Sequence, residues 1–222
     1  MSQFFITGTD TDIGKTYISS IIFNSLGDNT CYYKPIQTGC TYVDNKIFIP
    51  DLDYVKSNSN ISTNENFSCS YSLKHPISPH LSAQISNIQI DISHITNHFT
   101  NLKKKFENVL VEGAGGIFTP INKDKSYFIY NLIQDLKIKT ILVTDAKIGT
   151  INHTLLTLNF LKTMNITISG IVFNKFKNTY YENDNIEFIK QYSNIENTLI
   201  IPYKNTNNHL TTKEISNFIK NI

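Results

Sequence analysis

The chain has 222 residues, of which 40% are hydrophobic and 17% charged, and its formal net charge is +2 at pH 7. These values predict a single globular domain over residues 1–222 with a full hydrophobic core. No apolar run approaches membrane-spanning length, and no basic block is longer than Lys103-Lys104-Lys105, so neither a membrane nor a nucleic acid is expected as a partner.

The first predicted element is a short apolar strand, Phe4–Ile6, followed by Gly8–Thr16 with the sequence GTDTDIGKT and then by a helical pattern. Strand, glycine-containing loop and helix in this order are typical of a nucleotide phosphate site, because backbone N–H groups and the helix dipole point at the anion. We predict that Lys15 contacts the β- and γ-phosphates and that the Thr16 hydroxyl holds Mg²⁺. The alternative is a loop that merely turns tightly.

Strand and helix patterns continue to alternate after this loop. The first helix ends near Gly27, and residues 31–33 predict a strand that ends at Lys34-Pro35. Residues 40–90 are polar and weakly patterned, and we expect excursions and short helices above a sheet there, not a separate domain. The remaining predicted elements are helices over 95–106, 128–136, 151–161 and 215–222 and strands over 109–111, 140–143, 168–173 and 198–201.

This alternation predicts an α/β fold like that of P-loop NTPases, in which a parallel sheet carries helices on both faces. Ligands of such sheets bind at the carboxyl ends of the strands. Thr16, Lys34 and Glu112 each fall just past a predicted strand end, so we expect them to converge on one edge of the sheet.

Two segments at this edge carry candidate catalytic groups. Glu112-Gly113-Ala114-Gly115-Gly116 offers a carboxylate for Mg²⁺ and glycines that let the backbone approach a ligand; the alternative is an exposed turn. Lys34 could stabilise charge on a transferring phosphoryl group or hold an anionic substrate. Thr38 could bind the same substrate, or could simply be a turn residue.

Three further polar residues have open alternatives. Asp51 or Asp53 could complete a Mg²⁺ shell, but Asp51 follows Pro50 and could equally be a helix N-cap. Asn174 ends a predicted strand, where its amide could pair with an adenine edge or form a turn.

The basic residues and the cysteines limit which catalytic groups the chain can use and which cellular compartment is expected. All twenty basic residues are Lys, so an arginine finger in cis is excluded. Cys31, Cys40 and Cys69 lack metal-like spacing and suggest reduced thiols. Because Met1-Ser2-Gln3 also lacks the features of a signal peptide, we expect a cytoplasmic protein.

Taken together, the segments resemble the dethiobiotin synthetase family, ATP-dependent enzymes of biotin synthesis. The resemblance rests on GTDTDIGKT (8–16), KPIQTG (34–39), SPH (78–80), EGAGG (112–116), TP (119–120), GTINH (149–153) and GIVFN (170–174). The additional loop residue before Gly14 is normal in that family, whereas residues 177–197 match poorly.

The resemblance implies a parallel α/β fold, a homodimer, ATP as co-substrate, Mg²⁺ as cofactor and a small-molecule diamine. In that family the 7-amino group of 7,8-diaminononanoate (7,8-diaminopelargonate) takes up CO₂ to give a carbamate. The carbamate oxygen attacks the γ-phosphate of ATP, giving a carbamic–phosphoric anhydride. The 8-amino group then closes the ring to dethiobiotin and releases phosphate.

The resemblance also implies residue roles. Lys34 and Lys15 would be catalytic. Thr16, Asp51 and Glu112 would bind the metal, with Asp51 preferred to Asp53 because Val55 then matches an apolar position of the family. Thr11, Thr38 and Gly115 would contact the diamine, and Asn152 would reach it from the neighbouring subunit. ATP would contact Asp12, Ile13, Gly14, Lys15, Thr16, Tyr17, Asp51, Glu112, Gly113, Ala114, Gly115, Asn174, Lys175, Ile201, Pro202 and Tyr203.

Two alternatives remain. A related ATP-dependent amide ligase usually carries a glutaminase domain, for which this chain has no room. A partition-type ATPase switch normally has a second Lys early in the phosphate loop, and none lies between Thr9 and Ile13.

Overall fold

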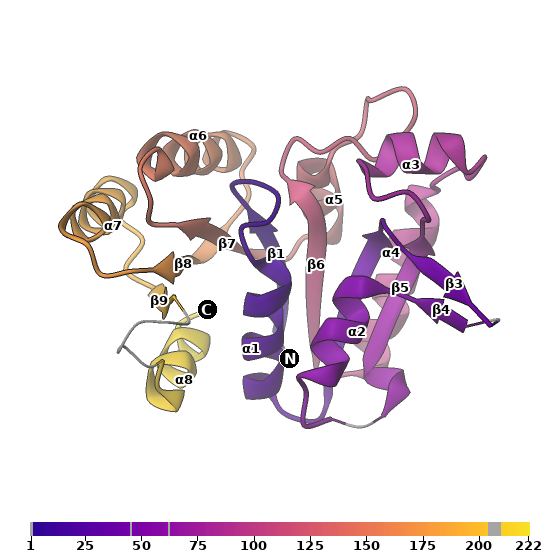
Figure 1. Cartoon of the computed structure of the whole chain (residues 1–222), viewed down its shortest axis with the longest axis horizontal. Coiled ribbons are helices and arrows are strands. Elements are labelled where there is room, and N and C mark those ends of the chain that lie inside the picture. The colour runs from indigo at the N-terminus through magenta and orange to yellow at the C-terminus, as the bar shows by residue number, and fades with distance from the viewer. Residues whose placement is uncertain (1, 45, 62, 204–209) are drawn as a thin grey trace.

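The sheet at the centre of the molecule is parallel. The computed structural model describes residues 2–44, 46–61, 63–203 and 210–222, in which seven strands form one sheet in the order β5-β2-β6-β1-β7-β8-β9. Every neighbouring pair in this sheet is parallel, so all carboxyl ends lie at one edge. Figure 1 shows β7, β1 and β6 side by side at its centre. The strands are β1 (Ser2–Gly8), β2 (Thr30–Gln37), β5 (Phe67–Ser72), β6 (Asn108–Gly116), β7 (Lys139–Asp145), β8 (Ile168–Phe176) and β9 (Thr198–Pro202).

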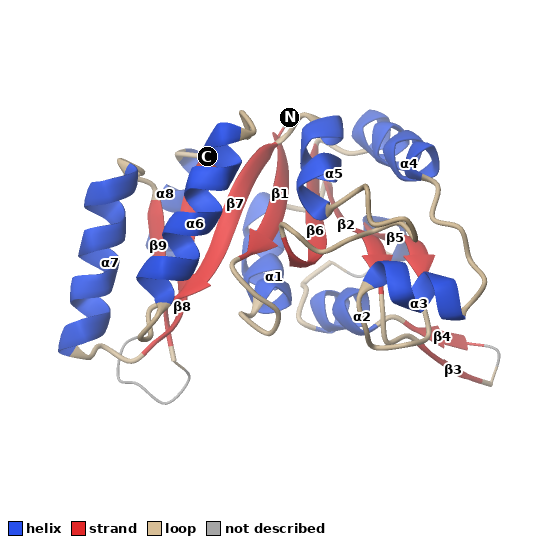
Figure 2. Cartoon of the chain, turned by 90° about the horizontal axis from the view of Figure 1, so that it is seen from above, coloured by secondary structure: helices blue, strands red, loops and turns tan. Residues whose placement is uncertain are grey.

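Helices cover both faces of this sheet, as predicted. One face carries α1 (Lys15–Leu26), α2 (Pro50–Ser57) and α8 (Thr212–Lys220), and the other carries α4 (Ile92–Lys105), α5 (Ile129–Leu136), α6 (Thr150–Thr163) and α7 (Tyr180–Ser193). In Figure 2, α5 and α6 lie in front of the strands and α1 and α8 lie behind them. The hairpin β3 (Thr41–Val43) and β4 (Lys46–Phe48), the short η1 (Asn64–Asn66) and α3 (Pro79–Ile85) lie outside these layers.

Successive side chains of a strand point to opposite faces of the sheet, so each face has its own hydrophobic core. In β1, Phe5 packs in the cluster that contains the apolar faces of α4 and α5, whereas Phe4 and Ile6 pack in the cluster that contains those of α1 and α8. All three side chains are almost fully buried. Burial on both faces explains why the central strands have continuous apolar runs.

One predicted element was wrong, and one helix was missed. Residues 67–72 were expected to lie above the sheet, but they form its edge strand β5. Alternating serines in FSCSYS hide that strand, because an edge strand needs less apolar surface than a central one. No helix was predicted between 177 and 197, where α7 lies; its capping box at Thr179 and Glu182 was the available signal.

The strand ends were also placed too early. Lys34 lies inside β2 and Glu112 inside β6, not past their ends. The pairing of β2 with β6 runs only to Tyr33, so Pro35 sits where no β6 partner needs its missing N–H. None of the described helices is long and apolar enough to cross a membrane.

Candidate active site

The loop between β1 and α1 has the backbone of an anion site. Gly14, the N-cap of α1, has a left-handed φ of 97°, and no side chain caps the first turn. The N–H groups of that turn are therefore available to a ligand, and the helix dipole favours a negative charge there. The loop is held from outside, because Asn174 Nδ2 donates to the Ile13 carbonyl at 2.8 Å and Thr9 N to the Val143 carbonyl at 3.0 Å.

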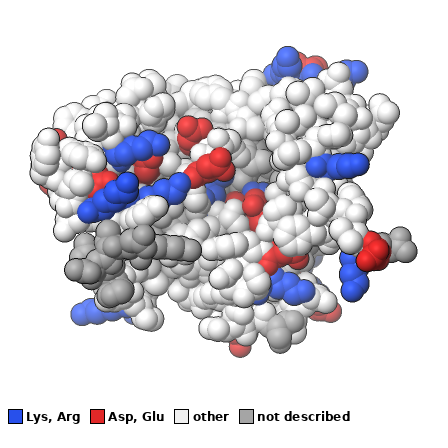
Figure 3. Space-filling model, viewed as in Figure 1, with Lys and Arg blue, Asp and Glu red and all other residues white. Residues whose placement is uncertain are grey.

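Next to this loop lies a cavity of about 380 Å³ at the carboxyl edge of the sheet. Figure 3 shows a hollow near the centre of one face of the molecule, with Lys and acidic atoms at its bottom. The cavity brings together most of the predicted catalytic, metal-binding and substrate-binding residues. It is lined by Thr11, Asp12, Gly14, Lys15, Thr16, Lys34, Ile36, Gln37, Thr38, Asp51, Glu112, Ala114 and Gly115.

Glu112 is the centre of the hydrogen-bond network in this cavity, and its side chain is fully buried. Its Oε1 accepts from the Thr16 hydroxyl at 2.9 Å and from Lys34 Nζ at 2.9 Å. Its Oε2 accepts from the Ser19 hydroxyl at 2.6 Å and from the Tyr32 hydroxyl at 2.9 Å. A buried carboxylate needs such donors, since desolvation of an unpaired charge is costly.

Lys34 connects the two predicted metal-binding carboxylates. Its Nζ lies 2.5 Å from Asp51 Oδ2 and also donates to the Gly113 carbonyl at 3.1 Å. Burial alone would lower the pKa of Lys34, but the charges of Glu112 and Asp51 outweigh it and raise that pKa above its usual value. Burial would likewise raise the pKa of Asp51, whereas the Lys34 ammonium lowers it. Lys34 and Asp51 therefore both stay charged at neutral pH.

Lys15 is in a different electrostatic situation. Its Nζ donates to the Asp10 carbonyl at 2.9 Å, without a carboxylate within ion-pair distance among the described residues. Burial, and then the positive charge of Lys34, lower the pKa of Lys15 from 10.5 to about 8. A bound anion would therefore stabilise the Lys15 ammonium, which, within the residues that the structure describes, otherwise has only a carbonyl as its partner.

The oxygen donors fit a small hard cation. Thr16, Asp51 and Glu112 supply a hydroxyl and two carboxylates around the Lys34 ammonium, and Mg²⁺ in phosphate sites takes one or two carboxylates together with substrate oxygens. No group of three or more His, Cys, Asp or Glu side chains that could hold a metal occurs in the described part of the chain. A cation here would thus depend on oxygens of the nucleotide.

The choice between Asp51 and Asp53 has a structural basis. Asp53 Oδ2 accepts from the backbone N–H of Ile49 at 2.6 Å, at the start of α2, and so serves the helix terminus. Asp51 is not the N-cap, which is Ile49, and its carboxylate instead contacts Lys34. Of the two carboxylates, Asp51 is the one in the cavity.

Several predicted nucleotide contacts lie outside this cavity. Asn174 is buried and its amide nitrogen already bonds the loop, so it braces the phosphate loop. Lys175 Nζ donates to the Asp12 carbonyl at 2.7 Å. Ile201 is buried in the core, Pro202 is partly buried and Tyr203 is exposed. The other predicted nucleotide contacts that do not line it are Ile13, Tyr17 and Gly113. Asn152, which was predicted to reach the diamine from a neighbouring subunit, is exposed and also lies outside this cavity.

A second cavity, of about 660 Å³, adjoins the first one at Thr11 and is mainly apolar. Phe118 and Leu156, which are 55% and 64% exposed, line it together with Phe160. The charged and polar groups of the first cavity and the apolar walls of the second suit an amphipathic substrate that spans both.

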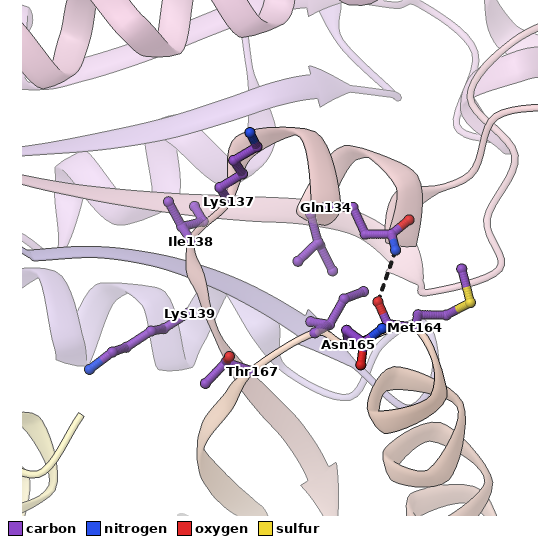
Figure 4. Close-up of a pocket in the computed structure, with 9 residues that line it drawn as sticks. Gln134, Lys137, Ile138, Lys139, Met164, Asn165 and Thr167 are labelled. Atoms are coloured by element: carbon purple, nitrogen blue, oxygen red, sulfur yellow. Dashed lines mark hydrogen bonds between the residues drawn. The ribbon is translucent and has the colours of Figure 1, made fainter.

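A third cavity, shown in Figure 4, lies at the opposite edge of the sheet. Its volume is about 450 Å³, and it lies where β7 and β8 begin, beside Lys139 and Thr167. The hydrogen bond drawn there joins Gln134 Nε2 to the Met164 carbonyl at 2.9 Å. It has no carboxylate and no phosphate loop, so it is not the candidate active site.

Ser19 and Tyr32 contact the central carboxylate, but sequence analysis missed both. Residue type alone does not mark a serine in a helix or a tyrosine in an apolar strand as part of a functional site. Their spacing was the signal: Ser19 follows Thr16 by one helical turn, and Tyr32 and Lys34 share one face of β2.

Sequence comparisons find relatives that are ATP-dependent dethiobiotin synthetases. A family model described as an AAA domain matches residues 2–209. The ATP-dependent dethiobiotin synthetase of Fusobacterium nucleatum subsp. nucleatum is 43% identical over 217 residues, covering 97% of each chain. That of Anoxybacillus flavithermus is 37% identical over 214 residues, covering 94% of this chain and 95% of the relative.

Structural comparisons support the fold alone. A putative plasmid partition protein of Borrelia burgdorferi bound to AMPPNP aligns with a TM-score of 0.58 at 15% identity, covering 99% of this chain and 97% of that one. The Pyrococcus furiosus cell division ATPase MinD aligns with a TM-score of 0.54 at 15% identity, covering 100% and 98%. Both similarities confirm the predicted P-loop NTPase architecture.

Proposed function

The chain belongs to the ATP-dependent dethiobiotin synthetases, ligases of biotin synthesis, and from this premise we propose that it carboxylates 7,8-diaminononanoate and closes the ring to dethiobiotin. The single observation that carries the proposal is the pair of buried ammonium groups, Lys15 and Lys34, in one cavity beside the phosphate loop. Two anionic reactants must meet in this reaction, and paired cations at one site offset their repulsion.

The proposed reaction has three steps. The 7-amino group adds to CO₂ and loses a proton, giving a carbamate. A carbamate oxygen attacks the γ-phosphorus of ATP, and the bond to the β-phosphate oxygen breaks to release ADP. The 8-amino group then attacks the carbonyl carbon of the mixed anhydride and loses a proton, the bond from that carbon to the phosphate oxygen breaks, and phosphate leaves as the cyclic urea forms.

The proposed roles follow from position. Lys15 and the N–H groups at the start of α1 bind the β- and γ-phosphates. Lys34, which is held between Asp51 and Glu112, is proposed to face the carbamate and to stabilise the negative charge of the transferring phosphoryl group. Thr11, Thr38 and Gly115 line the same cavity and bind the polar end of the diamine.

Thr16, Asp51 and Glu112 would hold Mg²⁺ together with phosphate oxygens. When bound, the cation supplies charge neutralisation for the triphosphate. Asn174 and Lys175 hold the loop by its Ile13 and Asp12 carbonyls. Residues 201–203 lie beside the end of β8, where Tyr203 N donates to the Phe176 carbonyl at 2.7 Å, and adenine is proposed to lie on this side.

The hydrocarbon chain of the diamine is proposed to lie in the apolar cavity that adjoins the active site at Thr11. Exposed Phe118 and Leu156 at this cavity suit an interface with a second copy of the chain. Asn152 lies on α6 near Leu156 and is exposed, so in a homodimer it would be available to the neighbouring site.

The experiment is mass spectrometry of the products after incubation with ATP, Mg²⁺, bicarbonate and 7,8-diaminononanoate. We expect the cyclic urea only when all four are present. Omission of the diamine or of bicarbonate should stop phosphate release, whereas brisk turnover of ATP alone would favour a switch ATPase. Absence of the cyclic urea from the complete mixture would overturn the proposal.

A further inference from the structure

The two oxygens of the Glu112 carboxylate face different surroundings. Oε1 contacts Thr16 and Lys34, which line the active-site cavity. Oε2 contacts Ser19 and Tyr32, which do not line it. Oε1 therefore faces the proposed active site, and Oε2 is hydrogen-bonded to side chains that lie outside it.

The Tyr32 contact comes from strand register. Tyr32 of β2 pairs with Leu110 of β6, and Glu112 lies two positions further along β6, on the same face as Leu110. The fully buried tyrosine spans this diagonal, so that its hydroxyl reaches Oε2 at 2.9 Å. Ser19 reaches the same oxygen at 2.6 Å from α1.

We propose that Tyr32 is a positioning residue, whose hydroxyl, together with that of Ser19, fixes the rotation of the Glu112 carboxylate and keeps Oε1 directed into the cavity. This inference rests on the proposed function, because that function supplies the cation and the nucleotide that Glu112 would help to bind. Without the Tyr32 hydroxyl, Oε2 retains one donor, and the carboxylate gains freedom to turn away from Thr16 and Lys34.

The chain contains a matched control in the next residue. Tyr33 is also fully buried on β2, but it packs in the opposite core, where its hydroxyl bonds Ser70 Oγ at 2.6 Å and the Ile95 carbonyl at 3.2 Å. Both Tyr32→Phe and Tyr33→Phe remove a buried hydroxyl from the same strand. Only Tyr32→Phe removes a contact to Glu112.

The test measures Mn²⁺ binding to the full chain with ADP by electron paramagnetic resonance, together with the Mg²⁺ concentration that gives half-maximal cyclic-urea formation. Tyr32→Phe should weaken Mn²⁺ binding and raise the half-saturating Mg²⁺ concentration, each roughly tenfold, by loss of a hydrogen bond to a charged group. The KM for the diamine should stay the same. Tyr33→Phe should match the wild type in both measurements.

Ser19→Ala provides a second variant if Tyr32→Phe folds poorly, and it should shift Mn²⁺ binding in the same direction. If Tyr32→Phe and Ser19→Ala bind Mn²⁺ as tightly as Tyr33→Phe does, the hydroxyls are merely structural and the inference is wrong. A wild-type protein that binds Mn²⁺ with ADP but forms no cyclic urea would instead contradict the proposed function. The two failures are thus distinguishable.

Discussion

Lys34 and Glu112 come from neighbouring parallel strands, and Lys34 Nζ meets Glu112 Oε1 at 2.9 Å with both side chains almost fully buried. An ion pair in this position is poor evidence for stability, because desolvation opposes the attraction between the charges. Its place beside a phosphate loop, with Asp51 as a second carboxylate, suggests that it is retained for chemistry.

Lys34→Ala should leave nucleotide binding largely intact and abolish diamine-dependent phosphate release. The reason is that Lys15 and the start of α1 remain to bind phosphates, whereas the charge proposed to stabilise the transferring phosphoryl group is lost. We expect kcat to fall on the order of 10²-fold or more. ADP binding by calorimetry and phosphate release measure the two effects separately.

The control for this variant is Lys213→Ala. Lys213 is an exposed lysine on α8 and does not line the cavity. It should turn over like the wild type. Near wild-type turnover of Lys34→Ala would show that the assigned role is wrong.

The sequence predicted the layers of the fold better than the details of the site. The phosphate loop and the apolar strands have strong local patterns, so β1, α1 and the parallel character of the sheet could be predicted from residues alone, whereas the order of its strands was not predicted. The edge strand β5 was not, because serines fill alternate positions. Local spacing places Ser19 beside Thr16 and Tyr32 beside Lys34, but their contacts with Glu112 depend on how three separate elements pack.

Nucleotide affinity should depend on pH through Lys15. Its pKa of about 8 means that the free protein holds an ammonium below that pH and a neutral amine above it. Since phosphate binds the charged form, binding above pH 8 requires uptake of a proton, and affinity should fall by up to about tenfold per pH unit.

Calorimetric titration of ADP between pH 6 and 10 in buffers of different ionisation enthalpy measures both the affinity and the proton uptake. Lys15→Met should bind weakly at every pH and lose this dependence. A wild-type affinity that is flat across pH 8 would contradict the account.

Gly14→Ala should destroy nucleotide binding, because a Cβ atom at this position would lie 2.2 Å from Asn174 Nδ2 and push the loop away from its support. Gly27→Ala is the matched control, since Gly27 also has a positive φ but its Cβ would meet nothing within 4 Å. Each change should cost about 1–2 kcal/mol of stability from backbone strain. Thermal melts with and without ADP separate the two, and equal ADP stabilisation of both variants would refute the assigned role of Gly14.

Leu156→Asp should convert the proposed homodimer into a monomer by placing a charge on the exposed apolar surface beside Phe118. Phe188→Asp, at an exposed aromatic residue of α7 outside that cavity, should leave the mass unchanged. Light scattering after size-exclusion chromatography gives the mass of each. A wild-type protein that is monomeric at micromolar concentration would remove the basis for the role of Asn152.

The central claim is that a carbamate oxygen, brought to ATP by Lys15 and Lys34, attacks the γ-phosphorus. If so, the oxygen that bridges carbon and phosphorus must leave with the phosphate when the ring closes. Rapid incubation with ¹⁸O-labelled bicarbonate, followed by mass spectrometry of the released phosphate, should therefore find a single labelled oxygen transferred in the wild type. Release of unlabelled phosphate while the cyclic urea accumulates would contradict it, since the phosphoryl group would then have passed to water.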